Sequence, residues 1–295
     1  MKNHFFISML AAAALLGGLT ACNGKLDKAP RADQVPENAV RITASIGNPF
    51  AATRSMPLGT EEEQGKFNVG DEIFVARKEN SDIKEYAIYR FDGSVWTPKD
   101  GKYLLWGKDQ IDLEAFYPAE VGLKALKGEV PDLQTDQSTK ENIAKADFMA
   151  IELKQVKKTD QALNLEMKRL TSRFIVKIAG FNSEFPADAK VENVRFHNKN
   201  DASAPLRTYI PYAKGEGKTG STYTVLVPHY AAHNTISLEV GGKTMTAKLS
   251  RITYDTGKSY TYRLTVGKEK LETTEVTVSD WTSSAVIPGG EAKAN

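Results

Sequence analysis

The chain has 295 residues, a length that at roughly 150 residues per domain suggests about two domains. Hydrophobic residues make up 41% and charged residues 26%, which gives enough apolar surface for a sizeable core and argues against wholesale disorder. Its 39 Lys and Arg nearly balance its 37 Asp and Glu, and no long basic run is present, so we do not expect a nucleic-acid partner.

The first 21 residues have the pattern of an export signal. Lys2 precedes an apolar segment at residues 5–16, which suits a secretory signal and is shorter than the roughly 20 residues of a permanent membrane helix. The sequence LTAC at residues 19–22 resembles the bacterial lipobox, in which the cysteine is acylated and the chain is cut just before it. This predicts a lipid anchor, such as palmitate, at Cys22 rather than an ordinary signal peptide. No other thiol remains for a disulfide, a zinc site or a nucleophile.

A flexible tether is predicted at residues 22–40. Residues 23–40 combine two prolines with mixed charges and almost no bulky apolar side chains. Such a stretch buries too little surface to offset the entropy lost on ordering, so we expect it to connect the lipid to the fold.

The periodicity after the tether is that of β-strands. Ile42, Ala44 and Ile46 share one face of a half-buried first strand, and polar residues 48–64 follow it. The turn sequences Asp92-Gly93 and Asp100-Gly101 predict a three-stranded antiparallel meander that ends in Tyr103–Trp106, and Gly241-Gly242 predicts another hairpin. The other expected strands lie near residues 72–77, 111–117, 147–152, 162–167, 173–178, 191–196, 222–227, 259–266 and 275–279.

Helices are expected to be minor. Residues 118–145 are predicted to form a loop, with at most a short helix near Glu141–Ala146. Many short strands separated by turns, without the helices of a βαβ pattern, predict an all-β fold of antiparallel sandwiches. Because Lys168–Ser172 separates two extended segments, we predict an N-terminal domain at 41–170 and a C-terminal domain at 171–295.

Several short motifs follow one another along the mature chain. They are the lipobox at 19–22, Thr53-Arg54, FNVGDEI at 67–73, LEAFYP at 113–118, and YTY at 260–262 with VTVSDW at 276–281. In this order and spacing they resemble the fimbrillin family, the Mfa-like fimbrium subunits of Bacteroides-type bacteria.

The resemblance implies a type V pilus subunit made of two tandem transthyretin-like, Greek-key β-sandwiches and displayed at the outer membrane. In that family an arginine-specific protease removes the lipidated N-terminal segment with the first strand, and a strand of another subunit replaces it by donor-strand exchange. Expected partners are other pilus subunits, the protease, the outer membrane and a ligand on a host or bacterial surface. After Trp281 the only apolar run is residues 285–287, so stalk, tip, anchor and accessory roles stay open.

Three arginines are candidates for the processing site. Cleavage at Arg31 or Arg41 would free the lipid and leave the first strand in place. Arg54 follows that strand in a polar segment, residues 51–59, of the kind that proteases reach. Cleavage after Arg54 is therefore predicted to remove the strand and open an apolar groove.

No enzyme, cofactor or metal site is predicted. His229 and His233 have the spacing of paired ligands on a helix, but Pro228 precedes them and no Glu lies between them, so we interpret them as loop residues. Glu61–Glu63 suggests either a calcium ligand set or a solvated loop, and we favour the loop. No nucleophile elbow or phosphate-binding loop occurs, and the carboxylates are too numerous to pair from sequence into a glycosidase dyad.

Four aromatic residues leave a second function open. Trp96, Tyr103, Trp106 and Phe116 could stack on sugar rings, although packing within sheets is the preferred interpretation. The principal prediction is a non-enzymatic structural or adhesive pilus subunit, and the alternative is a monomeric surface lipoprotein that binds glycans.

Overall fold

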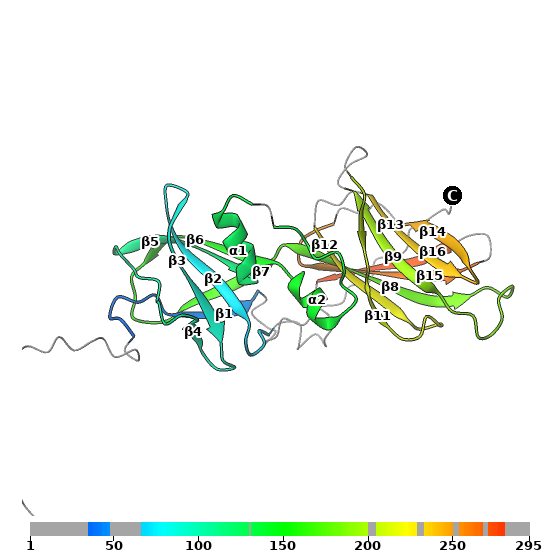
Figure 1. Cartoon of the computed structure of the whole chain (residues 1–295), viewed down its shortest axis with the longest axis horizontal. Coiled ribbons are helices and arrows are strands. Elements are labelled where there is room, and N and C mark those ends of the chain that lie inside the picture. The colour runs from blue at the N-terminus through cyan, green and yellow to red at the C-terminus, as the bar shows by residue number, and fades with distance from the viewer. Residues whose placement is uncertain are drawn as a thin grey trace, which may run out of the picture. The chain divides into compact units, whose positions relative to one another are not determined.

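The computed structural model describes residues 35–47, 66–129, 131–199, 205–228, 233–249, 254–267 and 271–280. Strands dominate these residues and two short helices accompany them (Figure 1). In this described part of the chain, neither helix is long and apolar enough to cross a membrane. The all-β prediction is confirmed.

The strands up to residue 169 form one seven-stranded sheet. Its order is β1-β7-β6-β5-β2-β3-β4, and all neighbouring pairs are antiparallel except β1 with β7. The strands are β1 (Ile42–Ile46), β2 (Glu72–Glu79), β3 (Asp82–Phe91), β4 (Trp96–Pro98), β5 (Gln110–Tyr117), β6 (Met149–Lys157) and β7 (Leu163–Arg169).

This sheet encloses a core because its two ends face each other. Side chains of β1 and β7 share one apolar cluster with side chains of β2, β3, β4 and β5, although β1 and β4 lie at opposite ends of the strand order. β5 shows the responsible pattern, since every second residue from Ile111 to Tyr117 is buried and the residues between them are half-buried. The result is a sandwich-like layer arrangement built from one sheet.

The strands from residue 171 onward form two sheets with a second core between them. Their orders are β10-β9-β13-β14 and β11-β12-β8-β15-β16, and within them only β8 and β15 run parallel. The strands are β8 (Thr171–Phe181), β9 (Glu192–Lys199), β10 (Arg207–Tyr209), β11 (Tyr212–Lys214), β12 (Thr222–Pro228), β13 (His233–Val240), β14 (Lys243–Lys248), β15 (Lys258–Val266) and β16 (Leu271–Asp280).

The helix α1 (Ala119–Leu126) is a correction to the predicted loop. It packs on the outer face of β2, where the side chain of Phe74 is fully buried. Gly122 permits this approach, because a Cβ atom there would lie 2.4 Å from the Phe74 ring. An eight-residue helix with a central glycine is weakly stable alone, so contact with the sheet rather than helix propensity stabilises it.

The predicted turns are mostly confirmed. Asp92-Gly93 joins β3 to β4, and Gly241-Gly242 joins β13 to β14, with positive φ angles at all three glycines. The predicted third strand of the meander at Tyr103–Trp106 is wrong, because Leu105 makes only an isolated bridge to Ala39. The third member of the antiparallel meander is β2, on the other side of β3.

The predicted domain boundary near residue 170 coincides with the change of sheet. The cores divide differently, because Leu133, Ile143 and Ala146 precede β6 and yet pack in the second core. Ile143 and its neighbours belong to α2 (Lys140–Lys145), the short helix that the sequence predicts. We propose two domains on this basis, with residues 131–146 assigned to the second.

Candidate functional site

The first strand is held at the edge of its sheet. β1 pairs in parallel with β7, from Ile42 opposite Leu163 to Ile46 opposite Met167. Gly47 continues the ladder, since its backbone N–H donates to the Met167 carbonyl at 2.8 Å. Within the described residues β7 is the one strand that pairs with β1.

The residues just before β1 are held by a different segment. Val40 N–H donates to the Leu104 carbonyl at 2.8 Å, and the Tyr89 hydroxyl donates to the Val40 carbonyl at 2.7 Å. The same hydroxyl accepts a hydrogen bond from Leu104 N–H at 3.3 Å, and burial raises the pKa of Tyr89. Ala39 and Val40 are buried. The folded part of the chain therefore begins before residue 40, where the predicted tether is expected to end.

Burial of β1 follows the alternation predicted from its sequence. Ile42 and Ile46 are each 4% exposed and pack in the first core, while Ala44 is half-buried against it. Leu165 and Met167 of β7 belong to the same cluster and are fully buried. Loss of β1 would therefore expose a continuous apolar strip beside an unpaired strand.

The second half of the chain offers an internal comparison. Its first strand, β8, also runs parallel to a late strand, β15, but β12 pairs with its other side. β8 is thus central, whereas β1 is peripheral. A central strand cannot leave without breaking two ladders, so of these two strands β1 is the one suited to replacement.

Of the three candidate processing residues, the structure describes one, Arg41. Arg54, Arg31 and Cys22, the predicted lipidation residue, lie outside the described residues. Arg41 lies between the two bonded stretches, and its carbonyl accepts a hydrogen bond from Leu163 N–H at 2.9 Å. A protease must bind an extended, unpaired segment, so the backbone at Arg41 is protected although its side chain is exposed.

The aromatic residues proposed as sugar platforms are mostly core residues. Trp96 is 7% exposed, with its ring centroid 5.0 Å from that of Phe67 and 5.1 Å from that of Phe91. Trp106 is 1% exposed, and Tyr103 and Phe116 are half-buried. Stacking on a sugar requires an exposed ring face, so the packing interpretation is confirmed for both tryptophans.

The two histidines in the described part of the chain lie in strands. His233 begins strand β13, which excludes a shared helix face with His229, a residue outside the described part. The ring of His197 on β9 is hydrogen-bonded on both sides, at 2.9 Å to the Thr208 hydroxyl and 2.8 Å to that of Ser237. Burial, with a smaller contribution from Arg195, lowers the pKa of His197. Among the described residues, no three His, Cys, Asp or Glu side chains gather as metal ligands, and Glu61–Glu63 falls outside them.

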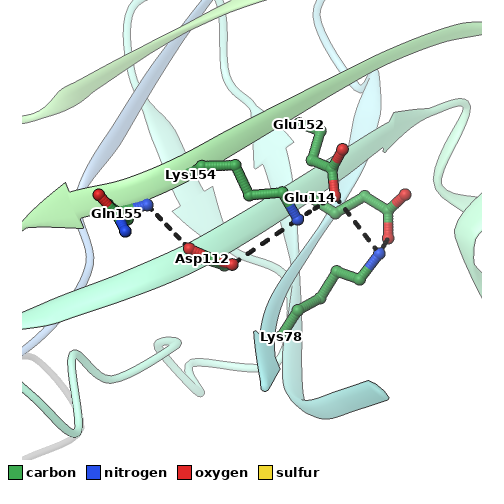
Figure 2. A network of polar contacts seen from close by, with 6 residues as sticks. All are labelled: Lys78, Asp112, Glu114, Glu152, Lys154 and Gln155. Carbon is green, nitrogen blue, oxygen red and sulfur yellow. Dashed lines mark hydrogen bonds and ion pairs between the residues drawn. The ribbon is translucent and has the colours of Figure 1, made fainter. Parts of the chain in front are cut away.

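The outer face of β2, β5 and β6 carries a network of ion pairs between two lysines and three carboxylates (Figure 2). Lys78 Nζ lies 3.0 Å from Glu114 and 3.7 Å from Glu152, and Lys154 bridges Glu152 and Asp112. The hydrogen bond from Lys154 lowers the pKa of Glu152. Each charge already has a partner, so this face is a solvated surface of the sheet rather than a ligand site.

Asp71, just before β2, is a partly buried acid that the sequence did not single out. It accepts hydrogen bonds from Asn68 N–H at 2.6 Å and from the Tyr117 hydroxyl at 3.1 Å. Burial raises the pKa of Asp71 to about 6, and the nearby carboxylate of Asp147 adds to the effect. The motif at residues 67–73 contains this residue, but only the contact of distant segments buries it.

Replacing Asp71 by Asn should change the pH dependence of stability. The folded pKa of about 6 lies above the ordinary value of 3.8, so protonated Asp71 stabilises the fold at low pH and this contribution disappears as the pH rises through 6. Relative to wild type, the variant should gain about 2 kcal/mol of unfolding free energy between pH 4 and pH 7.5. Urea unfolding of both proteins at both pH values measures this gain. A free-energy difference between variant and wild type that is the same at pH 4 and pH 7.5 would contradict the raised pKa of Asp71.

A comparison with family models decides what kind of protein has this architecture. The fimbrillin-like family model matches residues 54–281, most of the chain. The chain belongs to the fimbrillin-like family. The comparison with curated proteins gave no match.

Several solved structures of proteins from Bacteroides and Porphyromonas species are similar to this chain. A protein of Bacteroides uniformis provisionally ascribed to cell adhesion has a TM-score of 0.56 and 15% identity, over 83% of this chain and 100% of that one. A similarly described protein of Bacteroides ovatus has a TM-score of 0.55 and 11% identity, over 85% and 99%. The tip fimbrial protein Mfa3 of Porphyromonas gingivalis gives a TM-score of 0.46 and 12% identity, over 72% and 95%.

Membership of the fimbrillin-like family supports a pilus or adhesive subunit. It equally favours a surface or fimbrial location, contact with other pilus subunits and a structural rather than enzymatic role. The edge position of β1 in this fimbrillin-like chain is the feature that bears on how such a subunit could assemble.

Proposed function

We propose that this chain is a lipid-anchored, non-enzymatic subunit of a type V-like pilus at the outer membrane, assembled when β1 is cut away and replaced by a strand of another subunit. The observation that carries the proposal is the placement of β1, which pairs with β7 alone among the described strands and buries Ile42 and Ile46 in the core. An incoming strand would regain the ladder along β7 and refill the same apolar pockets.

The extent of the β1 ladder supports a cut after Arg54. β1 and its extension end at Gly47, so a cut must come later to release the whole strand. Arg54 is the first basic residue after Gly47, and Lys66 is the next. Cleavage after Arg54 releases β1 and leaves the short polar stretch from Ser55 ahead of β2 as the new N-terminus.

Limited trypsin treatment of wild type and Arg54→Ala tests the cut. Wild type should acquire an N-terminus at Ser55 and form oligomers. The Arg54→Ala variant should show neither, because trypsin no longer cuts after residue 54 and β1 stays attached to the chain. Arg41→Ala is the matched control and should behave as wild type, since Arg41 lies within the paired region. N-terminal sequencing and size-exclusion chromatography give the readouts. Oligomers that form equally without the cut would refute strand replacement.

The lipid anchor depends on the single thiol. Cys22→Ala should abolish incorporation of labelled palmitate and release the protein from the membrane fraction, because one residue supplies the whole attachment. Ser8→Ala, within the expected signal, is the control and should leave both unchanged. A Cys22→Ala protein that is still labelled and membrane-bound would refute the anchor.

A further inference from the structure

A cavity of about 480 Å³ lies on the side of the first core where α1 faces residues 131–148. Its walls come from the start of β2, the end of β5, α1 and α2. This volume falls in the range of small-molecule sites, and Tyr117 and Phe148 supply aromatic surface.

The carboxylates that line the cavity differ in whether a cationic side chain pairs with them. Three of its five carboxylates have cationic partners, namely Glu72 with Arg90 and Lys99, Glu120 with Lys124, and Asp132 with Arg207, and a fourth, Glu141, is exposed to solvent. Asp71 differs, because its oxygens accept hydrogen bonds only from the neutral groups of Asn68 and Tyr117. The cavity therefore presents a partly buried carboxylate without a cationic partner among the described residues.

Such a carboxylate favours a particular kind of occupant. Bringing a positive charge to Asp71 would stabilise its ionised form, which burial now disfavours. The described residues hold no set of three acidic or imidazole ligands, so the cavity offers no cage for a metal ion. Aromatic surface favours an organic cation, whose stem packs against rings while its charge stays near their faces.

The amount of charge is limited by the cavity itself. Lys124 and Lys145 also line it, so a second positive charge on the occupant would meet repulsion. We propose that this cavity binds an organic monocation, an ammonium or guanidinium on an apolar stem, with the charged group facing Asp71 and the stem against Tyr117 and Phe148. The source is either a free amine or a lysine or arginine side chain of a peptide.

Titration of the full chain with n-butylguanidinium, followed by NMR shifts of the backbone amides of Asp71, Tyr117 and Phe148, tests the site. A saturable shift is expected with wild type. Asp71→Asn should weaken binding about tenfold or more, because it removes the charge of the carboxylate that faces the cation. Asp112→Asn removes an equal charge from the solvated network and should bind as wild type. Ala144→Leu, which fills the cavity and retains Asp71, should also abolish binding.

Two further probes test the need for charge and the source of the cation. n-Pentanol, a neutral analogue, should not bind. The blocked peptide acetyl-Gly-Arg-Gly-amide distinguishes a peptide side chain from a free small cation. Binding of the peptide as well as the free cation identifies a side chain as the source, and binding of the free cation alone identifies a small amine. Absence of a saturable shift at millimolar n-butylguanidinium, equal binding by Asp71→Asn, or equal binding of n-pentanol would overturn the proposal. None of these outcomes bears on the Arg54 experiment.

Discussion

Replacing Asp147 by Ala is expected to lower the free energy of unfolding by about 3–5 kcal/mol, as the loss of one partner of a buried ion pair generally does. The carboxylate lies just after α2 and is fully buried. Arg169, the last residue of β7, donates to it from Nε at 3.0 Å and from an Nη atom at 3.1 Å. The variant leaves the guanidinium buried without the carboxylate that accepts these bonds.

The matched control for this prediction is another Asp–Arg pair. Asp132 lies 2.8 Å from Arg207, but the two side chains are 68% and 36% exposed. Because water screens an exposed pair, Asp132→Ala should cost at most about 1 kcal/mol. Urea unfolding of both variants at pH 7.5 gives the comparison, and equal losses would contradict the importance of burial.

Truncation of Ile46 to Ala should cost about 2–5 kcal/mol, the usual range for a fully buried aliphatic side chain. Ile46 is 4% exposed and packs against the core at the end of β1. The same ladder carries Thr43, whose side chain is exposed, so Thr43→Ala is the control for any loss of strand propensity. Denaturant midpoints at equal m-value measure both effects.

The outcome of this pair of variants bears on how β1 is held. If the apolar side of β1 anchors it, the Ile46→Ala loss should greatly exceed the Thr43→Ala loss. A loss shared equally by the two variants would instead assign the stability of β1 to backbone pairing, and an incoming strand would then need no matching apolar side chains.

Local features of this fold were predictable because they depend on neighbours in the sequence. Asp92-Gly93 and Gly241-Gly242 form the expected turns since glycine there adopts positive φ, at 104°, 56° and 78°. The alternation of Ile42, Ala44 and Ile46 likewise needs only the period of a strand.

Features that depend on distant contacts were missed. The parallel pairing of Ile42 with Leu163 joins segments far apart in the sequence, and no local pattern distinguishes it from an antiparallel pairing. α1 packs on the sheet where Gly122 meets Phe74, and Asp71 is partly buried where the Tyr117 hydroxyl donates to it. The amino acids at these positions would be the same whether or not the contacts formed, so the local sequence does not reveal them.

Amide hydrogen exchange along β7 tests strand replacement most directly, because β7 loses its β1 partner on cleavage and regains a partner on assembly. We predict slow exchange in the intact chain, fast exchange in cleaved monomer freed of its N-terminal peptide, and slow exchange again in assembled material that lacks this peptide. β8, which keeps both of its neighbours, should exchange slowly throughout. Assembled material that still contains the β1 peptide, or in which β7 stays fast, would contradict the proposed function.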